Sequence, residues 1–307
     1  MPKVRRLGVS DKDKVKRPSS VALGIGGAGR NIITDVQLQN ILNVKTFEVG
    51  KPSRPFKSPS ISINKMDMKN AFKSSINVKN RPLTRSENKI KHKIKDVDIL
   101  YILSGLGGDI GSYSVPVCAE LGKASSMFVV GLLAKPFDSE SDTRRKLADR
   151  SQVEASKYMD LPIVLSNEKL LEINPQLPIA EAFAVMNNII AFPMIDFNGI
   201  ITKNDLSKLQ NICEDINEFR IGAGYGNGRE YGLRAIKEAL RSPWVEELDD
   251  VSKILLMITK KREGRTGSVD DVIDEIKTTY PETDIIWGLK TDKKLKKEIR
   301  VTILAGK

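Results

Sequence analysis

The sequence has few of the residues that most often build disulfides, metal centres and nucleophilic active sites. Its 307 residues include two cysteines and one histidine. Cys118 and Cys213 lie far apart in helical patterns, which is typical of buried free thiols in a reducing compartment. His92 stands within a lysine-rich run. We therefore expect no metal site and no catalysis by histidine.

A long hydrophobic run is also missing. No apolar stretch approaches the roughly 20 residues that are needed to span a bilayer. Residues 1–6 contain no apolar core of the kind that a secretory signal carries. With two thiols that are expected to be reduced, these features favour a cytoplasmic protein.

Acidic residues are outnumbered by basic ones, and the formal net charge at pH 7 is +11. Much of the charge lies in residues 3–17 and 290–297. Such runs are usually solvated faces, and the alternative is a weak attraction to anionic lipid or nucleic acid. No aromatic residue is interleaved with these basic residues, so a base-stacking surface is not indicated and nucleic acid is not the expected partner.

Two glycine-rich turns are the strongest functional signal in the chain. Residues 24–29 and 105–112 each follow an apolar run and precede a segment with helical spacing. Glycine at a strand-to-helix turn lets backbone N–H groups approach an anion closely, and the helix N-terminus adds a favourable dipole. Two such turns in one α/β domain indicate a phosphate-rich ligand held from two sides, so a nucleotide is the leading ligand class.

The order of apolar runs predicts an α/β fold, with a mostly parallel sheet in a Rossmann-like domain over residues 19–177. A basic flexible extension is expected over residues 1–18, and a long buried helix over 178–196. A smaller α+β domain is expected over residues 197–307. The expected strands are 20–24, 45–48, 60–64, 98–103, 126–133 and 162–165, then 253–259, 283–288 and 298–304. The expected helices of the second domain are 205–219, 228–241 and 268–278.

Arranged in this order, the motifs resemble the FtsZ/tubulin superfamily over residues 19–307. Residues 24–31 resemble the first phosphate loop of FtsZ, and 105–112 resemble the tubulin signature loop around the phosphates. Further similarity lies in residues 135–144, 165–171, 182–188, 222–228, 242–243 and 300–306. The resemblance implies the tubulin/FtsZ fold with its long central helix, GTP or GDP as the bound nucleotide, and head-to-tail assembly.

The resemblance also implies a role for individual residues. Asn31 and Asn187 would bond the guanine edge, since an amide offers both a donor and an acceptor. Glu140 would accept the ribose hydroxyls, and Arg144 would lie near the phosphates. The ring of Phe183 would stack on the base. The expected nucleotide contacts are Gly26, Gly27, Gly29, Asn31, Gly105, Gly107, Gly108, Asp109, Gly111, Ser112, Glu140, Arg144, Asn167, Phe183 and Asn187.

Each of these side chains also has a purely structural alternative. Asn31 could cap a helix, Glu140 and Arg144 could form a surface ion pair, and Phe183 could belong to the core.

The phosphate loops depart from the family pattern. Asp109 stands where glycine is usual, and a carboxylate beside phosphates is repulsive unless Mg²⁺ or another cation intervenes. Mg²⁺ is therefore an optional companion of the nucleotide. Ile110 replaces a threonine hydroxyl, and residues 71–81 contain no glycine where FtsZ places a loop against the γ-phosphate. We expect that contact to be lost or remodelled.

A third departure concerns the loop after the central helix, where the family carries Asn-x-Asp-x-x-Asp and inserts it into the next subunit's nucleotide site. In residues 203–209, Asp205 takes the first carboxylate position and Lys208 the second. An ammonium cannot orient or deprotonate water as a carboxylate does, and would pair with the γ-phosphate. β-Tubulin likewise carries lysine there, and the GTP that it covers is not hydrolysed. A register slip of one or two residues would change these assignments.

The leading hypothesis is thus a GTP-binding filament protein with weak or absent hydrolysis at its own interface. It would assemble alone or with a catalytically complete FtsZ, in division or shape control, and a membrane adaptor would dock on a surface other than a C-terminal tail. The alternative is a non-polymerising scaffold with a degenerate pocket. A nicotinamide oxidoreductase is a third hypothesis, because residues 24–29 and Glu48 fit a dinucleotide fingerprint. It leaves the second glycine turn unexplained.

Overall fold

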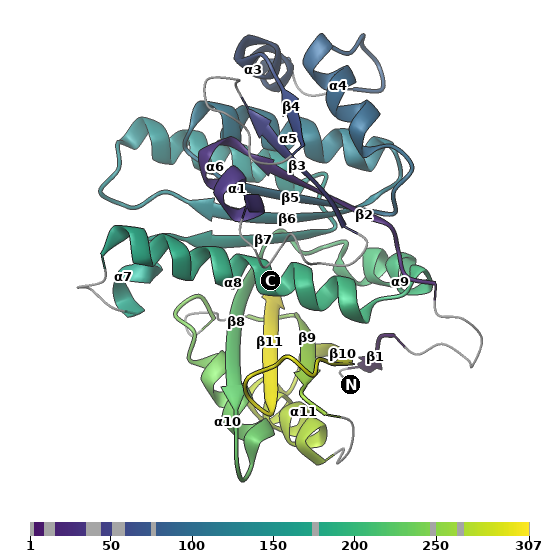
Figure 1. Ribbon diagram of the computed structural model, residues 1–307, viewed down its shortest axis with the longest axis vertical. Coiled ribbons are helices and arrows are strands. Elements are labelled where there is room, and N and C mark those ends of the chain that lie inside the picture. The colour runs from purple at the N-terminus through teal and green to yellow at the C-terminus, as the bar shows by residue number, and fades with distance from the viewer. Residues whose placement is uncertain are drawn as a thin grey trace. The chain divides into compact units, whose positions relative to one another are not determined.

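The computed structural model describes residues 3–8, 16–34, 44–50, 59–74, 78–173, 178–245, 250–262 and 267–306. The chain divides into two compact units. The first unit is residues 18–191, and the second unit is residues 192–307 together with residues 1–17. Figure 1 shows the elements of both units.

The first unit contains a parallel sheet in the order β4-β3-β2-β5-β6-β7. Its strands are β2 (Ser20–Ile25), β3 (Val44–Gly50), β4 (Ser60–Ser62), β5 (Ile99–Gly105), β6 (Phe128–Lys135) and β7 (Leu161–Ser166). β5 lies in the middle and is buried from Ile99 to Ser104, as expected for a parallel strand covered on both faces. The predicted mostly parallel sheet is confirmed.

Helices cover both faces of this sheet. A Cβ at Gly122 would meet the side chains of Leu100 and Val129, so α5 (Asp109–Ala124) packs on the face that these residues share. On β2, the side chains of Leu23 and Ile25 belong to the same core cluster as α5, whereas a Cβ at Gly24, on the other face, would meet the Ile33 side chain of α1 (Gly26–Thr34). The described helices of the unit are α1 (Gly26–Thr34), α3 (Lys65–Lys73), α4 (Arg85–Ile94), α5 (Asp109–Ala124), α6 (Asp142–Ser156) and α7 (Lys169–Ile173).

The second unit is a mixed sheet in the order β1-β10-β9-β11-β8. β11 runs antiparallel to β8 and β9, whereas β9, β10 and β1 run parallel. The strands are β1 (Val4–Arg6), β8 (Phe219–Gly226), β9 (Lys253–Lys260), β10 (Asp284–Thr291) and β11 (Ile299–Gly306), and the helices that follow the long helix are α9 (Lys203–Cys213), α10 (Tyr231–Leu240) and α11 (Gly267–Thr279). The predicted α+β character is confirmed.

The N-terminal residues differ from the flexible extension that the basic composition predicts. β1 pairs in parallel with β10, the buried Leu7 donates its N–H to the carbonyl of Trp287 at 2.7 Å, and the Arg6 guanidinium lies 4.8 Å from the Trp287 ring centre. Two of the three residues of β1 are exposed arginines, so the sequence shows a charged run here and not the apolar pattern that indicates a strand. Residues 9–15 of the predicted extension lie outside the described residues.

The long helix α8 (Ile179–Ile200) extends four residues beyond its predicted end, and it passes from the first unit to the second at residues 191–192. Within the second unit it carries a fully buried acid, Asp196. The Asp196 carboxylate accepts bonds from Arg300 Nη2 at 2.5 Å, and from the hydroxyls of Thr259 and Thr302 at 3.0 Å. Lys290 Nζ lies 3.0 Å away. This network fastens the end of α8 to three strands.

Burial opposes ionisation of Asp196, but the charges and hydrogen bonds of Arg300 and Lys290 outweigh it and hold the pKa of the carboxyl below its usual range.

Within the described ranges, no helix combines the length and the apolar character that crossing a membrane requires.

Candidate nucleotide-binding site

The two predicted glycine turns lie against each other at the carboxyl edge of the first unit's sheet. The first turn links β2 to α1 and the second links β5 to α5. A Cβ at Gly26 would lie 3.4 Å from the Gly111 nitrogen, and one at Gly105 would lie 2.9 Å from the Ala28 Cβ. Parallel α/β sheets bind their ligands outside this edge. The structure therefore brings both turns to one place where a ligand is expected.

Some of these glycines are required by the fold itself. A Cβ at Gly29 would lie 2.1 Å from the carbonyl oxygen of Leu103, and one at Gly111 would lie 2.2 Å from that of Gly105. Gly107 has a φ of +89°, a conformation that favours glycine. The Ser112 hydroxyl is fully buried and accepts the Gly107 N–H at 2.8 Å. These residues shape the turns, and a direct contact of Ser112 with nucleotide stays a prediction.

Two other glycines have no described neighbour in front of them. A Cβ at Gly27 or at Gly108 would find no atom of the described residues within 4 Å. Gly27 lies in the first turn of α1, and Gly108 is the N-cap of α5, which has no side-chain capping bond. The N–H groups at a helix start have no partner within the helix. Packing thus does not require glycine at these two positions, and both leave room for an anion beside a helix N-terminus.

Asp109, the first residue of α5, does not stand alone beside this opening. Its carboxylate is ion-paired with Lys65, the first residue of α3. The hydrogen bond that Lys65 donates to Asp109 raises the pKa of Lys65. Both side chains are partly exposed. The repulsive carboxylate predicted from the sequence is therefore neutralised by a lysine that sequence reasoning missed, because no motif joins residues 44 positions apart.

The residues at this edge do not fit a metal centre held by the protein. In the part of the chain that the structure describes, no group of three or more His, Cys, Asp or Glu side chains is arranged to hold a metal ion. The Asp109 carboxylate, whose repulsion of phosphate was expected to need Mg²⁺ or another cation, is engaged by Lys65.

Glu140 and Arg144 stand beside the second turn. The carbonyl oxygen of Arg144 would lie 3.2 Å from a Cβ at Gly107. Arg144 Nη1 lies 2.5 Å from Glu140 Oε2, and Glu140 Oε1 accepts the Phe137 N–H at 3.0 Å. The surface ion pair that the sequence left open is thus formed. Arg144 is 53% exposed, so its charge is accessible, and its contact with nucleotide stays a prediction.

Asn167, which directly follows β7, carries an unsatisfied acceptor. The residue is 9% exposed, and its buried Oδ1 has no donor among the described residues. Its backbone N–H donates to the carbonyl of Lys135 at 3.2 Å, which fixes the residue at the carboxyl edge. A buried amide oxygen without a donor is costly. A ligand hydroxyl or N–H is one group that would satisfy it.

The predicted base-binding residues come from two helices. Asn31 is exposed on α1, and Asn187 is half-buried on α8. The side chain of Phe183, also on α8, lies outside what the structure describes. Glu48, the acid of the oxidoreductase hypothesis, is buried, and it lies 2.8 Å from Arg30 Nε.

In the second unit, Asp205 and Lys208 occupy α9 in different environments. Asp205 is 3% exposed, and its carboxylate accepts the Thr202 N–H at 2.8 Å, the Thr202 hydroxyl at 2.7 Å and the Gly8 N–H at 3.1 Å. Lys208, one turn later, is exposed. Asp205 thus caps its own helix, a role that Thr-x-x-Asp spacing signals. Residues 202 and 205 also have the spacing of the family's two carboxylates, which offers a second register.

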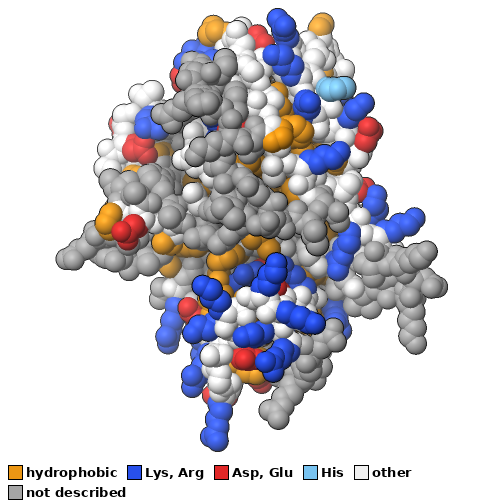
Figure 2. Space-filling model, viewed as in Figure 1, with side chains coloured by type: hydrophobic (Ala, Val, Ile, Leu, Met, Phe, Trp, Pro, Cys, Tyr) orange, Lys and Arg blue, Asp and Glu red, His pale blue; other side chains and the backbone are white. Residues whose placement is uncertain are grey.

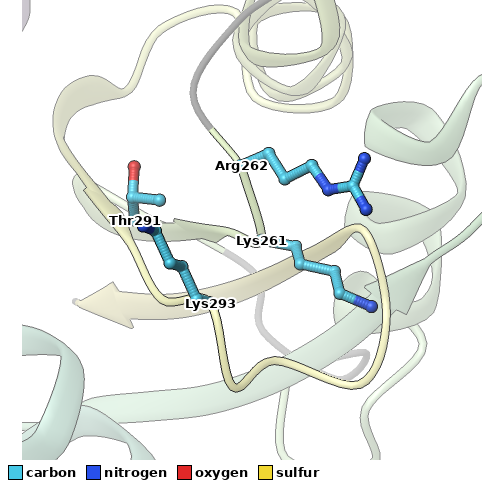
Figure 3. Close-up of a pocket in the computed structure, with 4 residues that line it drawn as sticks. All are labelled: Lys261, Arg262, Thr291 and Lys293. Atoms are coloured by element: carbon cyan, nitrogen blue, oxygen red, sulfur yellow. The ribbon is translucent and has the colours of Figure 1, made fainter.

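A separate hollow of about 530 Å³ lies in the second unit. Lys261, Arg262, Thr291 and Lys293 line it, and Lys261 and Arg262 extend side by side (Figure 3). Figure 2 shows other basic side chains on the same unit. The described residues that line this hollow include none of the predicted nucleotide contacts.

Comparison with known proteins decides the family. The GTPase domain of the tubulin/FtsZ family matches residues 28–175, and the C-terminal domain of the FtsZ family matches residues 219–307. The chain belongs to the tubulin/FtsZ family. It is a divergent member, and the nicotinamide oxidoreductase hypothesis is replaced by this assignment.

The relatives of this tubulin/FtsZ chain have low sequence identity to it, but the matches extend over nearly all of this chain. Cell division protein FtsZ of Methanothermobacter thermautotrophicus is 25% identical over 94% of this chain and 79% of its own. Cell division protein FtsZ 1 of Thermococcus kodakarensis is 26% identical over 99% and 86%. Among solved structures, an empty FtsZ dimer of M. jannaschii has a TM-score of 0.80 at 24% identity over 95% and 89%, and CetZ of Methanosaeta thermophila has 0.71 at 18% over 94% and 86%. These likenesses confirm the predicted tubulin/FtsZ fold.

Proposed function

We propose that the chain binds guanine nucleotide at the carboxyl edge of the first unit's sheet and assembles head to tail into filaments. The observation that supports this most directly is that the two glycine turns pack together, and that no described atom would contact a Cβ at Gly27 or Gly108, at the starts of α1 and α5. A helix N-terminus favours an anion through its N–H groups and its dipole. Two such termini beside each other suit the phosphates of GTP or GDP.

The neighbouring side chains supply candidate contacts for the rest of the nucleotide. Asn31 and Asn187 would bond the guanine edge, and Glu140 would accept ribose hydroxyls. Arg144 would turn its exposed guanidinium to phosphate. Asn167 Oδ1, which has no donor among the residues that the structure describes, would accept a ribose hydroxyl or a base N–H. The Phe183 ring would stack on the base. Each of these groups is chemically matched to one part of a guanine nucleotide.

Hydrolysis at the self-interface is proposed to be slow or absent. If Asp205 holds the first carboxylate position, Lys208 holds the second. If Asp205 holds the second, Thr202 holds the first. In both registers one carboxylate is missing, and Oδ2 of Asp205 already accepts three hydrogen bonds, two from Thr202 and one from the Gly8 N–H. A buried carboxylate that is held in this way within its own unit is poorly suited to positioning water. Filaments would therefore persist, in division or shape control in the cytoplasm.

The nucleotide is tested first. Purified protein is denatured, and the released nucleotide is identified by ion-exchange chromatography. Guanine nucleotide is the expected result, and an excess of GTP over GDP would support slow hydrolysis. An empty protein that also fails to bind added GTP would overturn the proposal in favour of the non-polymerising scaffold.

Assembly is tested by sedimentation with and without GTP. A filament protein pellets with GTP, whereas a scaffold stays in the supernatant. Repeating the assay with a catalytically complete FtsZ added tests co-assembly, which would appear as both proteins in the pellet at a constant ratio.

The proposal that Lys208 causes slow hydrolysis is tested by Lys208→Asp. A carboxylate at this exposed position is expected to raise GTP turnover in assembled protein, and Ser207→Asp, also exposed on α9, is the control for added charge out of register. If Lys208→Asp leaves turnover unchanged while the variant still assembles, Lys208 is not the cause of slow hydrolysis.

A further inference from the structure

Lys65 and Asp109 form an ion pair at the point where the two glycine turns meet. Each is the first residue of its helix, α3 and α5 respectively. Gly111, two residues after Asp109, packs against Gly26 of the first turn. The pair therefore lies beside the open space over Gly108, at the end of the site where phosphate is expected. This is the arrangement from which we draw a further role for Lys65.

We propose that Lys65 is a phosphate-binding cation built into the site, which bridges Asp109 and the phosphates of the bound nucleotide and makes Mg²⁺ dispensable for binding. The inference rests on the proposed function, because it names how that same site compensates the charge of its ligand. It assigns no step of hydrolysis to Lys65.

The position of Lys65 is not explained by the stability of its own helix. A cation in the first turn of a helix opposes the helix dipole, which favours acidic residues there. The neighbouring Asn64 already caps α3, since its side chain accepts the Met66 N–H at 2.7 Å. A lysine at this position is stabilised instead by an anion in front of the helix. Asp109 is that anion in the protein alone, and a phosphate would be a stronger one.

The pair is also open enough to rearrange. Lys65 is 32% exposed and Asp109 is 46% exposed at their side chains. An ion pair in contact with solvent contributes little to stability, so the lysine loses little by sharing its charge with a second anion. Its ammonium carries three donors on a flexible stem, which allows it to bridge Asp109 and a phosphate oxygen together. The raised pKa of Lys65 agrees with an ammonium that stays protonated.

The charge balance at the turn requires such a group. Phosphate oxygens placed over Gly108 would face the Asp109 carboxylate, and repulsion between them must be offset by a cation. In many nucleotide sites Mg²⁺ supplies this charge, held by one or two carboxylates and the phosphates. Here the carboxylate is already engaged by Lys65. A lysine in this place performs the same neutralisation without a metal.

The test compares GTP affinity in Mg²⁺ and in EDTA for the full chain and its variants, measured by titration calorimetry. The wild type is expected to bind GTP with affinities within about threefold in the two buffers. Lys65→Ala is expected to lose about tenfold or more in EDTA, the size of one charge-assisted hydrogen bond. Mg²⁺ should return part of that loss. Lys65→Arg keeps the charge and should bind like the wild type in EDTA.

Two further variants distinguish the neutralisation of phosphate charge by Lys65 from a purely structural ion pair, or staple, that joins α3 to α5. Asp109→Asn should bind GTP as well as or better than the wild type, because Lys65 is then free for phosphate. The double variant Lys65→Ala with Asp109→Asn should recover part of the Lys65→Ala loss in EDTA. If the pair were only a staple, Asp109→Asn would weaken binding as much as Lys65→Ala does. Lys73→Ala, at the exposed C-terminal end of α3, is the control and should change nothing.

The outcomes distinguish the two proposals. A wild type that binds no GTP in either buffer overturns the proposed function itself. A wild type that binds GTP more than tenfold better with Mg²⁺, or a Lys65→Ala variant that matches it in EDTA, overturns the role of Lys65 alone. Thermal unfolding of each variant verifies that it is folded, and Lys65→Arg and Asp109→Asn keep the test decisive if Lys65→Ala fails to fold.

Discussion

The two units use the same pairing of carboxylate and cation in opposite ways. In the second unit, Asp196 is fully buried and is held by Arg300, Lys290 and two threonine hydroxyls. In the first unit, the Lys65–Asp109 and Glu140–Arg144 pairs lie partly in solvent. A buried pair cannot change partner without leaving a charge uncompensated, whereas an exposed pair can. Burial thus separates charges that hold the fold from charges that remain available for a ligand.

The largest effect is expected for Arg300→Ala. It leaves the buried Asp196 with Lys290 as its remaining cation, and breaking a buried pair in this way costs about 3–5 kcal/mol. Arg300→Lys, which keeps a charge, should cost less. Both tryptophans, Trp244 and Trp287, lie in the second unit, so urea unfolding followed by tryptophan fluorescence reports on this unit. A loss below about 1 kcal/mol would remove the basis of the comparison.

The next effect is expected within the first glycine turn. Gly29→Ala drives a Cβ to 2.1 Å from the Leu103 carbonyl oxygen and should destabilise the first unit by about 1–3 kcal/mol. The new Cβ of Gly27→Ala meets no atom of the described residues within 4 Å, so this variant should leave stability within about 0.5 kcal/mol while weakening GTP binding. Hydrogen exchange of the β2 and β5 amides, together with GTP titration, separates the two. Equal destabilisation by both variants would contradict the division between packing glycines and ligand-facing glycines.

A pH-dependent effect of intermediate size distinguishes the units further. Burial raises the pKa of Glu120, although the Val78 N–H and the Arg81 charge oppose the shift. Since the native state then binds more protons than the unfolded state, the first unit loses stability as pH rises from the ordinary carboxyl range through the raised pKa. The lowered pKa of Asp196 has the opposite sign, so the second unit loses stability as pH falls through it.

Glu120→Gln tests this assignment. The buried Glu120 Oε2 has no donor in the described ranges, and a neutral amide removes its buried charge. The variant should unfold with a free energy about 1 kcal/mol higher than the wild type at pH 7, and with no gain below about pH 4. Hydrogen exchange of α5 amides at both pH values measures it. A gain that persists unchanged at low pH would show that the carboxylate charge is not the cause.

The parts of the molecule that the sequence predicts well are those with local signals. The apolar run of β5 followed by Gly105 indicates a buried strand and a turn without reference to distant residues. The parts that it misses depend on long-range pairing. β1 meets β10, with Lys3 donating to Asp284 across 281 positions, and Lys65 meets Asp109 across 44. No periodicity within a short window carries that information.

Asp205 illustrates a different reason for a missed feature. Its place in a family motif suggests a carboxylate that faces water, whereas its spacing from Thr202 suggests a helix cap. Both patterns are legible in the sequence, and the burial of Asp205 with its bond to the Gly8 N–H favours the cap. The bond to Gly8 spans 197 positions, so the pattern alone could not have decided between the two.

The smallest effect on stability, and the sharpest test of the comparison, is expected for Glu140→Gln. Its pair with Arg144 is exposed, so unfolding should change by less than about 0.5 kcal/mol. If Glu140 accepts ribose hydroxyls, the variant should lose about threefold to tenfold in GTP affinity and should no longer distinguish GTP from its 2′-deoxy analogue. Arg144→Ala breaks the same pair but keeps the carboxylate, so it should keep that distinction. If Glu140→Gln and Arg144→Ala lose the distinction between GTP and its 2′-deoxy analogue equally, the pair acts only by positioning the loop before α6. The first unit would then use its exposed charges for structure, as the second unit uses its buried ones.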